Sequence, residues 1–152
     1  MSAAAGERNA NPAAATGRPM SAQTFVVTIH VPARPEYVPI LRAACGQLAP
    51  LLDCTLEEVV DLWLAVDEAT GFLLRNCVAV SRGAEQDDLS ATFVITGPGL
   101  RITLSRTADV SVRPDDDDFG WAILTALVDS FTWGVRGSTV RVDIRKQHAG
   151  GR

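Results

Sequence analysis

Carboxylates are the side chains of this sequence best suited to chemistry, and they gather in two places. Asp61 and Glu68 recur seven residues apart on one polar stripe of a long predicted helix, and Arg75 follows at the same interval. Asp115–Asp118 is a run of four aspartates. Such a run could hold a cation, but it is more typical of a solvated loop whose last residue, Asp118, caps the next helix.

Asp118-Phe119-Gly120 spells a signature of protein kinases. The chain is too short for that fold, and neither a glycine-rich loop nor a catalytic-loop motif accompanies the signature. We therefore reject a protein-kinase fold on this motif.

Three cysteines, Cys45, Cys54 and Cys77, form an odd number without the short spacing of metal ligands, so the sequence predicts no metal site. All three lie among apolar neighbours, which favours buried thiols in a reducing compartment. A redox switch that uses Cys45 or Cys54 is the alternative.

The elements that would position these residues can be predicted from the N-terminus. Thr24–Val31 is rich in β-branched and aromatic residues and predicts a strand. Pro35 and Pro39 bracket the start of a helix that extends to Ala49 and stops before a proline.

A longer helix should begin at Thr55 and run to about Ala79, because Thr55 and Glu58 have the spacing of a capping box. The stripe of this helix expected to face the core consists of Val59, Trp63, Val66, Leu73 and Cys77.

The second half of the chain predicts two strands, a helix and a strand. Leu89–Thr96 and Leu100–Arg106 alternate in polarity and are joined by a Gly-Pro-Gly turn. After a loop, a helix should run from Asp118 to about Phe131 and stop at Gly134. Thr139–Ile144 predicts the last strand.

This order predicts the α+β class, a two-layer sandwich of a mixed, mostly antiparallel sheet with helices on one face. Residues 1–22 lack large apolar side chains and predict a disordered tail. Residues 23–146 form one domain, and 147–152 a frayed end. A net charge of -4 argues against direct nucleic-acid binding. Without an export signal or a bilayer-length apolar run, we expect a cytoplasmic protein with no membrane contact.

The string Asp61–Ala69 (Asp-Leu-Trp-Leu-Ala-Val-Asp-Glu-Ala), together with the element order, resembles the anti-sigma-factor serine kinases of Gram-positive bacteria. These kinases share an ATPase superfamily with gyrase and histidine kinases. Phe119–Leu127 resembles divergent actinobacterial members, and the similarity covers roughly residues 24–145. The resemblance implies the histidine-kinase-like ATPase fold, with ATP and Mg²⁺ as cofactors.

The resemblance also implies roles for residues of the long helix. Glu68 matches the general base for phosphoryl transfer. Phe72 stands where the family has an asparagine that holds Mg²⁺, and a phenyl ring offers no oxygen ligand. Asn76 lies one turn further, about 6 Å along the axis, which is too far to replace it. The nucleotide site is therefore partly degenerate.

Two further family motifs are reduced here. In Ser105–Ser111 the adenine-reading position retains only Asp109, and no glycine follows it. The lid that precedes the last long helix retains Gly120 after four aspartates. The four aspartates would repel a triphosphate. One like charge about 4 Å away costs roughly 4 kcal/mol. Asp109 and Gly120 are the remaining candidates for nucleotide contact.

Three functions remain open. The first is an anti-sigma factor that sequesters an alternative sigma factor and is released by an anti-anti-sigma partner. The first helix, with Tyr37, Leu41 and Leu48, would then offer a partner or dimer surface. The second is an ATP-dependent serine kinase acting through Glu68. The third is a small-molecule or redox sensor whose apolar pocket is lined by Phe72.

Overall fold

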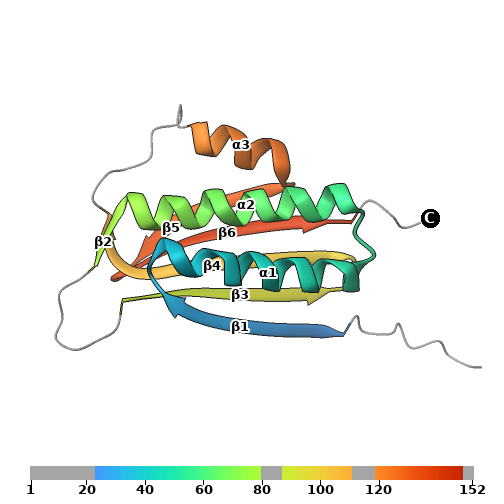
Figure 1. Ribbon diagram of the computed structural model, residues 1–152, viewed down its shortest axis with the longest axis horizontal. Coiled ribbons are helices and arrows are strands. Elements are labelled where there is room, and N and C mark those ends of the chain that lie inside the picture. Colours follow the sequence, from blue (N-terminus) through green and yellow to red (C-terminus); the bar gives the residue numbers. More distant parts are fainter. Residues whose placement is uncertain (1–22, 80–86, 111–118, 149–152) are drawn as a thin grey trace, which may run out of the picture.

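A computed structural model describes residues 23–79, 87–110 and 119–148 (Figure 1). Its elements are, in chain order, β1 (Thr24–Pro32), η1 (Pro35–Tyr37), α1 (Val38–Leu48), η2 (Ala49–Leu52), α2 (Leu56–Arg75), β2 (Cys77–Ala79), β3 (Asp88–Thr96), β4 (Gly99–Val110), α3 (Phe119–Leu127), β5 (Ser130–Arg136) and β6 (Thr139–Gln147). The expected tail at 1–22 and the acidic run Asp115–Asp118 lie outside the described residues.

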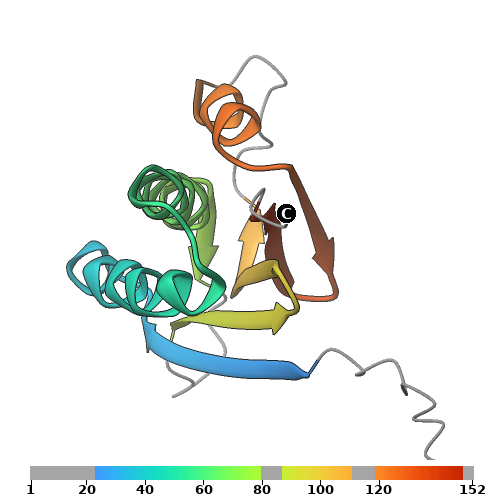
Figure 2. The same ribbon diagram turned by 90° about the vertical axis from the view of Figure 1, so that its right-hand side faces the viewer.

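One sheet carries the fold, with the strand order β1-β3-β4-β6-β5 and with β2 paired to the far end of β4. Every strand pairing in the described part is antiparallel, so the expected parallel component is not among them. The helices lie on one side of the curved sheet (Figure 2). The α+β class with helices on one face is thereby confirmed.

The core forms where alternating strand residues meet the helices. In β3, β4 and β6 every second side chain is buried, and the outer positions hold mainly Thr, Ser, Arg and Asp. This alternation places one face of each strand in the core and the other in solvent. The largest fully buried strand residues are Phe93, Leu89, Ile102, Leu104 and Ile144.

Helix α2 begins as its sequence predicts. The Thr55 hydroxyl accepts the Glu58 N–H at 3.2 Å, and the Glu58 carboxylate accepts the Thr55 N–H at 2.7 Å. This reciprocal pair satisfies two donors that a helix start otherwise leaves without a partner. The expected core stripe is correct for Val59, Val66 and Leu73, but Trp63 lies on the outer side and is partly exposed.

Three boundaries differ from the sequence prediction. Helix α2 ends at Arg75, and Cys77–Ala79 pairs with β4 as a short strand. Strand β4 continues to Val110 through residues expected to form a loop. Strand β6 continues to Gln147, so it enters the end expected to fray.

The largest difference is β5, which was expected to be the end of a helix. Helix α3 stops at Leu127, and Ser130–Arg136 pairs along β6, with Gly134 in mid-strand rather than at a helix terminus. Phe131 and Trp133 are two residues apart and half-buried, with exposed neighbours between and beside them. That period of two suits a strand, and the unpaired edge of β6 selects it over the helical alternative.

None of the described helices has both the length and the apolar character of a bilayer-crossing segment.

Candidate functional site

The residues carried over from the resemblance gather around the C-terminal half of α2. Glu68 is half-buried on this helix, one turn before Phe72. Asp109 is exposed on β4 opposite Val78 in β2, the strand that follows α2. Gly120 lies in the first turn of α3, whose next residue contacts Phe72. The fold therefore brings the segments that carry the three motifs to one region.

Aromatic rings fill the space where these segments meet. The Phe72 ring lies 4.9 Å from that of Trp121 on α3 and 5.7 Å from that of Trp133 on β5, centroid to centroid. Trp121 in turn stacks on Phe131 at 5.1 Å with an interplanar angle of 22°. We call Phe72, Trp121, Phe131 and Trp133 the aromatic cluster. Such offset and edge contacts add about 0.5–1.5 kcal/mol each to the gain from burial.

Packing in the aromatic cluster gives Phe72 a structural role. Its side chain is buried and holds α2, α3 and β5 together. A carbon ring packed in this way supplies no ligand for Mg²⁺, which requires oxygen. Asn76 is the C-cap residue of α2, and its N–H donates to the Phe72 carbonyl at 2.9 Å.

A buried arginine near this region has a structural role that the sequence did not reveal. Arg106 Nη1 donates to the carbonyls of Leu73 and Cys77 at 2.8 and 3.0 Å. Its Nε and Nη2 form a two-bonded pair with Asp87 at 3.0 and 2.6 Å. The guanidinium thus satisfies backbone carbonyls at the C-terminal end of α2. Its charge is neutralised by the Asp87 carboxylate, so it is not free for a phosphate.

Among the described residues, Glu68, Asp109 and Gly120 line none of five prominent surface cavities. Phe72 lines none of these five either, so the apolar pocket expected of a small-molecule sensor is not one of them. A groove of about 330 Å³ runs between α1 and α2, beside the ion pair of Arg42 and Asp67.

The first helix offers less partner surface than expected, because Leu41 is fully buried and Leu48 packs against the core. Tyr37 remains partly exposed. Exposed apolar side chains also lie on β1, with Phe25 and Val26, and at Leu51. A further apolar strip lies on α2. Four side chains at helical spacing form an apolar ridge: Leu56, Val60, Trp63 and Leu64, exposed by 79%, 40%, 36% and 46%.

Trp63 belongs to this apolar ridge because of a glycine on the neighbouring helix. A Cβ added at Gly46 would lie 2.6 Å from the indole nitrogen of Trp63 and about 3 Å from its ring carbons. The absence of a side chain at Gly46 therefore lets the indole approach α1 closely. The sequence placed Trp63 in the core because its position also fits the inner stripe.

The cysteines are free thiols, with Cys45 and Cys77 buried and Cys54 half-buried. Burial raises the pKa of the Cys45 thiol to about 12, with a smaller contribution from Cys54 nearby. Cys54 also lies beside Glu58 and His148, at the opposite end of α2 from Glu68. His148 was not a candidate in the sequence, because its contact with Glu58 spans 90 residues.

Comparison with protein-family models finds no match. Comparison with curated proteins finds none either. Among solved structures, the fold is similar to the crystal structure of the RsbU and RsbW domains of Rv1364c from Mycobacterium tuberculosis, with a TM-score of 0.60 and 11% sequence identity. The match covers 80% of this chain and 32% of that chain, so this chain spans about a third of its neighbour's length. The similarity shows that the predicted α+β fold is shared with that structure.

Proposed function

We propose that this protein is an anti-sigma factor that acts by binding rather than by catalysis. It would sequester an alternative sigma factor and release it when an anti-anti-sigma protein competes for the same chain. The sequence resemblance and the fold of the RsbW-containing neighbour support the same class of protein.

The observation that carries this proposal is the division of α2 into two faces. Its inner face holds Phe72 in the aromatic cluster, where the resembled kinases need a polar Mg²⁺ ligand. Its outer face carries the apolar ridge, which continues over four helical positions. A contiguous apolar strip on a helix is typical of a protein-docking surface. We therefore place sigma-factor contact on the ridge.

A kinase reaction through Glu68 has less support. The carboxylate is retained and half-buried on α2. However, Phe72 provides no metal ligand and the buried guanidinium of Arg106 is paired with Asp87. Without a cation to neutralise the phosphates, a carboxylate at this position would repel the nucleotide rather than activate a hydroxyl.

Affinity capture with the full-length chain from lysate of its native cells, read by mass spectrometry, tests the proposal. We expect a sigma factor in the captured material, and we expect Leu64→Asp to abolish its recovery because a charge on the ridge must be desolvated in the complex. Val135→Asp is the matched control: Val135 is similarly exposed, but on β5.

Recovery of neither a sigma factor nor an antagonist would refute the proposal. Equal recovery with Leu64→Asp and the wild type would retain anti-sigma binding but remove it from the ridge. Circular dichroism of both variants shows whether a loss reflects binding or folding.

A further inference from the structure

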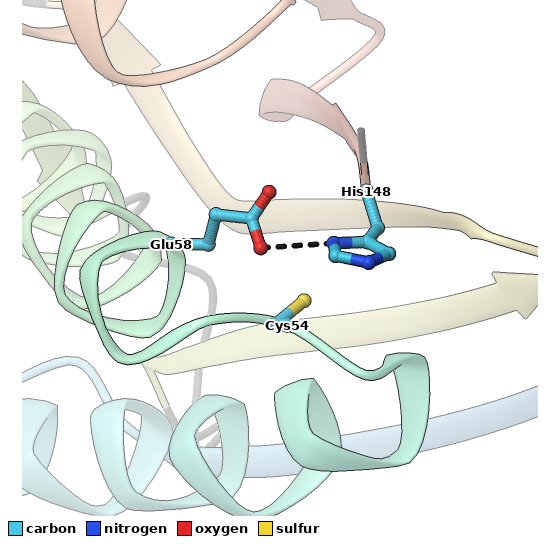
Figure 3. Close-up of side chains that lie close together, drawn as sticks. All are labelled: Cys54, Glu58 and His148. Atoms are coloured by element: carbon cyan, nitrogen blue, oxygen red, sulfur yellow. Dashed lines mark hydrogen bonds and ion pairs between the residues drawn. The ribbon is translucent and has the colours of Figure 1, made fainter. Parts of the chain in front are cut away.

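Three side chains with different metal-binding atoms converge at the N-terminal end of α2. One ligand atom each of Cys54, Glu58 and His148 lies within 4.8 Å of the others (Figure 3). Cys54 lies in the loop between η2 and α2, Glu58 in the first turn of α2, and His148 directly after β6. We call these residues the Cys-Glu-His cluster.

Hydrogen bonds hold the Cys-Glu-His cluster in place. Glu58 Oε2 accepts the Thr55 N–H at 2.7 Å and lies 2.9 Å from His148 Nδ1. The backbone N–H of His148 donates to the Pro98 carbonyl at 3.0 Å, which fixes the end of β6 against the β3–β4 turn. The Glu58 and His148 side chains are only 16% and 12% exposed. These contacts reduce the entropy that would otherwise be lost when a ligand orders the site.

We propose that the Cys-Glu-His cluster binds a divalent cation of the zinc class through one sulfur, one nitrogen and one oxygen atom. Zn²⁺ accepts these three donor types at about 2.0–2.3 Å, which places tetrahedral ligand atoms about 3.5 Å apart. The ligand atoms now lie up to 4.8 Å apart, so their separations need to shorten by roughly 1 Å. Side-chain rotation can supply a movement of this size. The fourth position would remain open to water or to an external ligand.

The charges around the cluster suit a cation that displaces protons. Burial raises the pKa of the Cys54 thiol, as do the neighbouring carboxylates of Glu58 and Asp53, while Lys146 opposes the shift. The pKa of Glu58 is held below its usual value, mainly by the Thr55 N–H and also by His148, although burial opposes this. Because zinc binds the thiolate form of cysteine, binding should release a proton and weaken as the pH falls.

The proposed site is separate from the region of the degenerate nucleotide motifs. Ten residues of helix separate Glu58 from Glu68, about 15 Å along the axis. A metal here would tie the end of β6 to the start of α2 and stabilise the folded chain. The proposal does not depend on sigma-factor binding and can fail independently of it.

Cobalt titration of the tag-free full-length protein, stripped with chelator beforehand, tests the site. We expect one equivalent of Co²⁺ to bind with a thiolate-to-metal charge-transfer band in the near ultraviolet, and Zn²⁺ to displace it. Cys54→Ser should abolish the band. His148→Ala and Glu58→Gln should weaken binding by tenfold or more, as losses at metal sites commonly do.

Two controls keep the result decisive. Cys45→Ala removes a buried thiol outside the cluster, and His30→Ala removes an exposed imidazole on β1; both should bind like the wild type. The proposal is overturned if the wild type shows no charge-transfer band and retains no Zn²⁺ in equilibrium dialysis. It is overturned equally if the band persists in Cys54→Ser.

Discussion

Asp143 shows at the scale of one residue how the outer face of the sheet is held. Its carboxylate accepts hydrogen bonds from three side chains: Arg101 at 3.2 Å, Thr103 at 2.7 Å and Arg141 at 2.7 and 2.9 Å. Partial burial alone would raise its pKa, but these bonds outweigh burial and hold the pKa of Asp143 below its usual value. The charged form is therefore stabilised in the folded protein.

Asp143→Asn should lower the free energy of unfolding at neutral pH by about 1.5–3 kcal/mol, the range for hydrogen bonds to a charged group. Because the folded pKa lies below the unfolded one, this stability is full above the ordinary aspartate pKa of about 3.9 and declines as the pH falls through the folded value. Urea unfolding at pH 7 and pH 3 measures both effects.

Asp67→Asn is the matched control for Asp143→Asn, because Asp67 pairs with Arg42 in a half-exposed salt bridge. Such pairs contribute about 0–1 kcal/mol. An Asp143→Asn variant that is as stable as this control at pH 7 would show that the three donors are satisfied by water instead.

The thiols give a second prediction at the same scale. Burial raises the pKa of Cys45 to about 12, so this thiol is almost wholly protonated at pH 8, and the thiolate is the reactive form. Iodoacetamide at pH 8 should leave Cys45 unmodified in the native protein while labelling all three cysteines in denaturant. Tryptic mass spectrometry reads each site. Rapid native labelling of Cys45 would contradict the burial and would revive a redox role for this thiol.

At the scale of elements, Arg106 joins three segments that are distant in sequence. Any other rotamer of Arg106 would break its hydrogen bonds to the end of α2, to Cys77 and to Asp87 before β3. Lysine would keep the charge but lose the planar fork that reaches these acceptors together.

Arg106→Lys should therefore lower the free energy of unfolding by about 1–3 kcal/mol, the cost of buried acceptors left without donors. Hydrogen exchange should show faster opening in the last turn of α2 than elsewhere, which a general loss of stability would not produce. Arg42→Lys, in the half-exposed pair with Asp67, provides the comparison and should cost less than 1 kcal/mol. Equal effects of the two substitutions would refute the bracing role.

The same scale shows how far the sequence predicts the structure. The capping box of α2 and the alternation of β3 are local patterns, and both were predicted because each depends on residues near one another in the chain. Strand β5 was not predicted, because Leu124, Leu127, Val128 and Phe131 keep helical spacing and only pairing with β6 selects the strand. The contact of the Phe72 ring with Trp121 and the approach of His148 to Glu58 likewise depend on tertiary packing.

At the scale of the whole molecule, the fold is shared with a solved structure although the two sequences differ at most positions. The sheet and α2 keep the architecture of the structural neighbour at 11% identity, because buried alternation and helix stripes tolerate replacement by residues of similar volume. A Mg²⁺–nucleotide site does not tolerate such replacement, since one missing oxygen ligand leaves the cation under-coordinated. The aromatic cluster places carbon rings, which offer no oxygen ligand, where α2, α3 and β5 meet.

Nucleotide binding should consequently contribute nothing to the stability of the whole chain. A ligand at one hundred times its dissociation constant stabilises a protein by about 2.7 kcal/mol, which is several degrees in Tm for a chain of this size. We expect millimolar ATP with Mg²⁺ to leave Tm where Mg²⁺ alone leaves it, in wild type and in Glu68→Gln alike. A rise of several degrees that requires both ATP and Mg²⁺ would mean that the cluster opens to admit a nucleotide, and catalysis through Glu68 would then have to be tested by phosphate transfer.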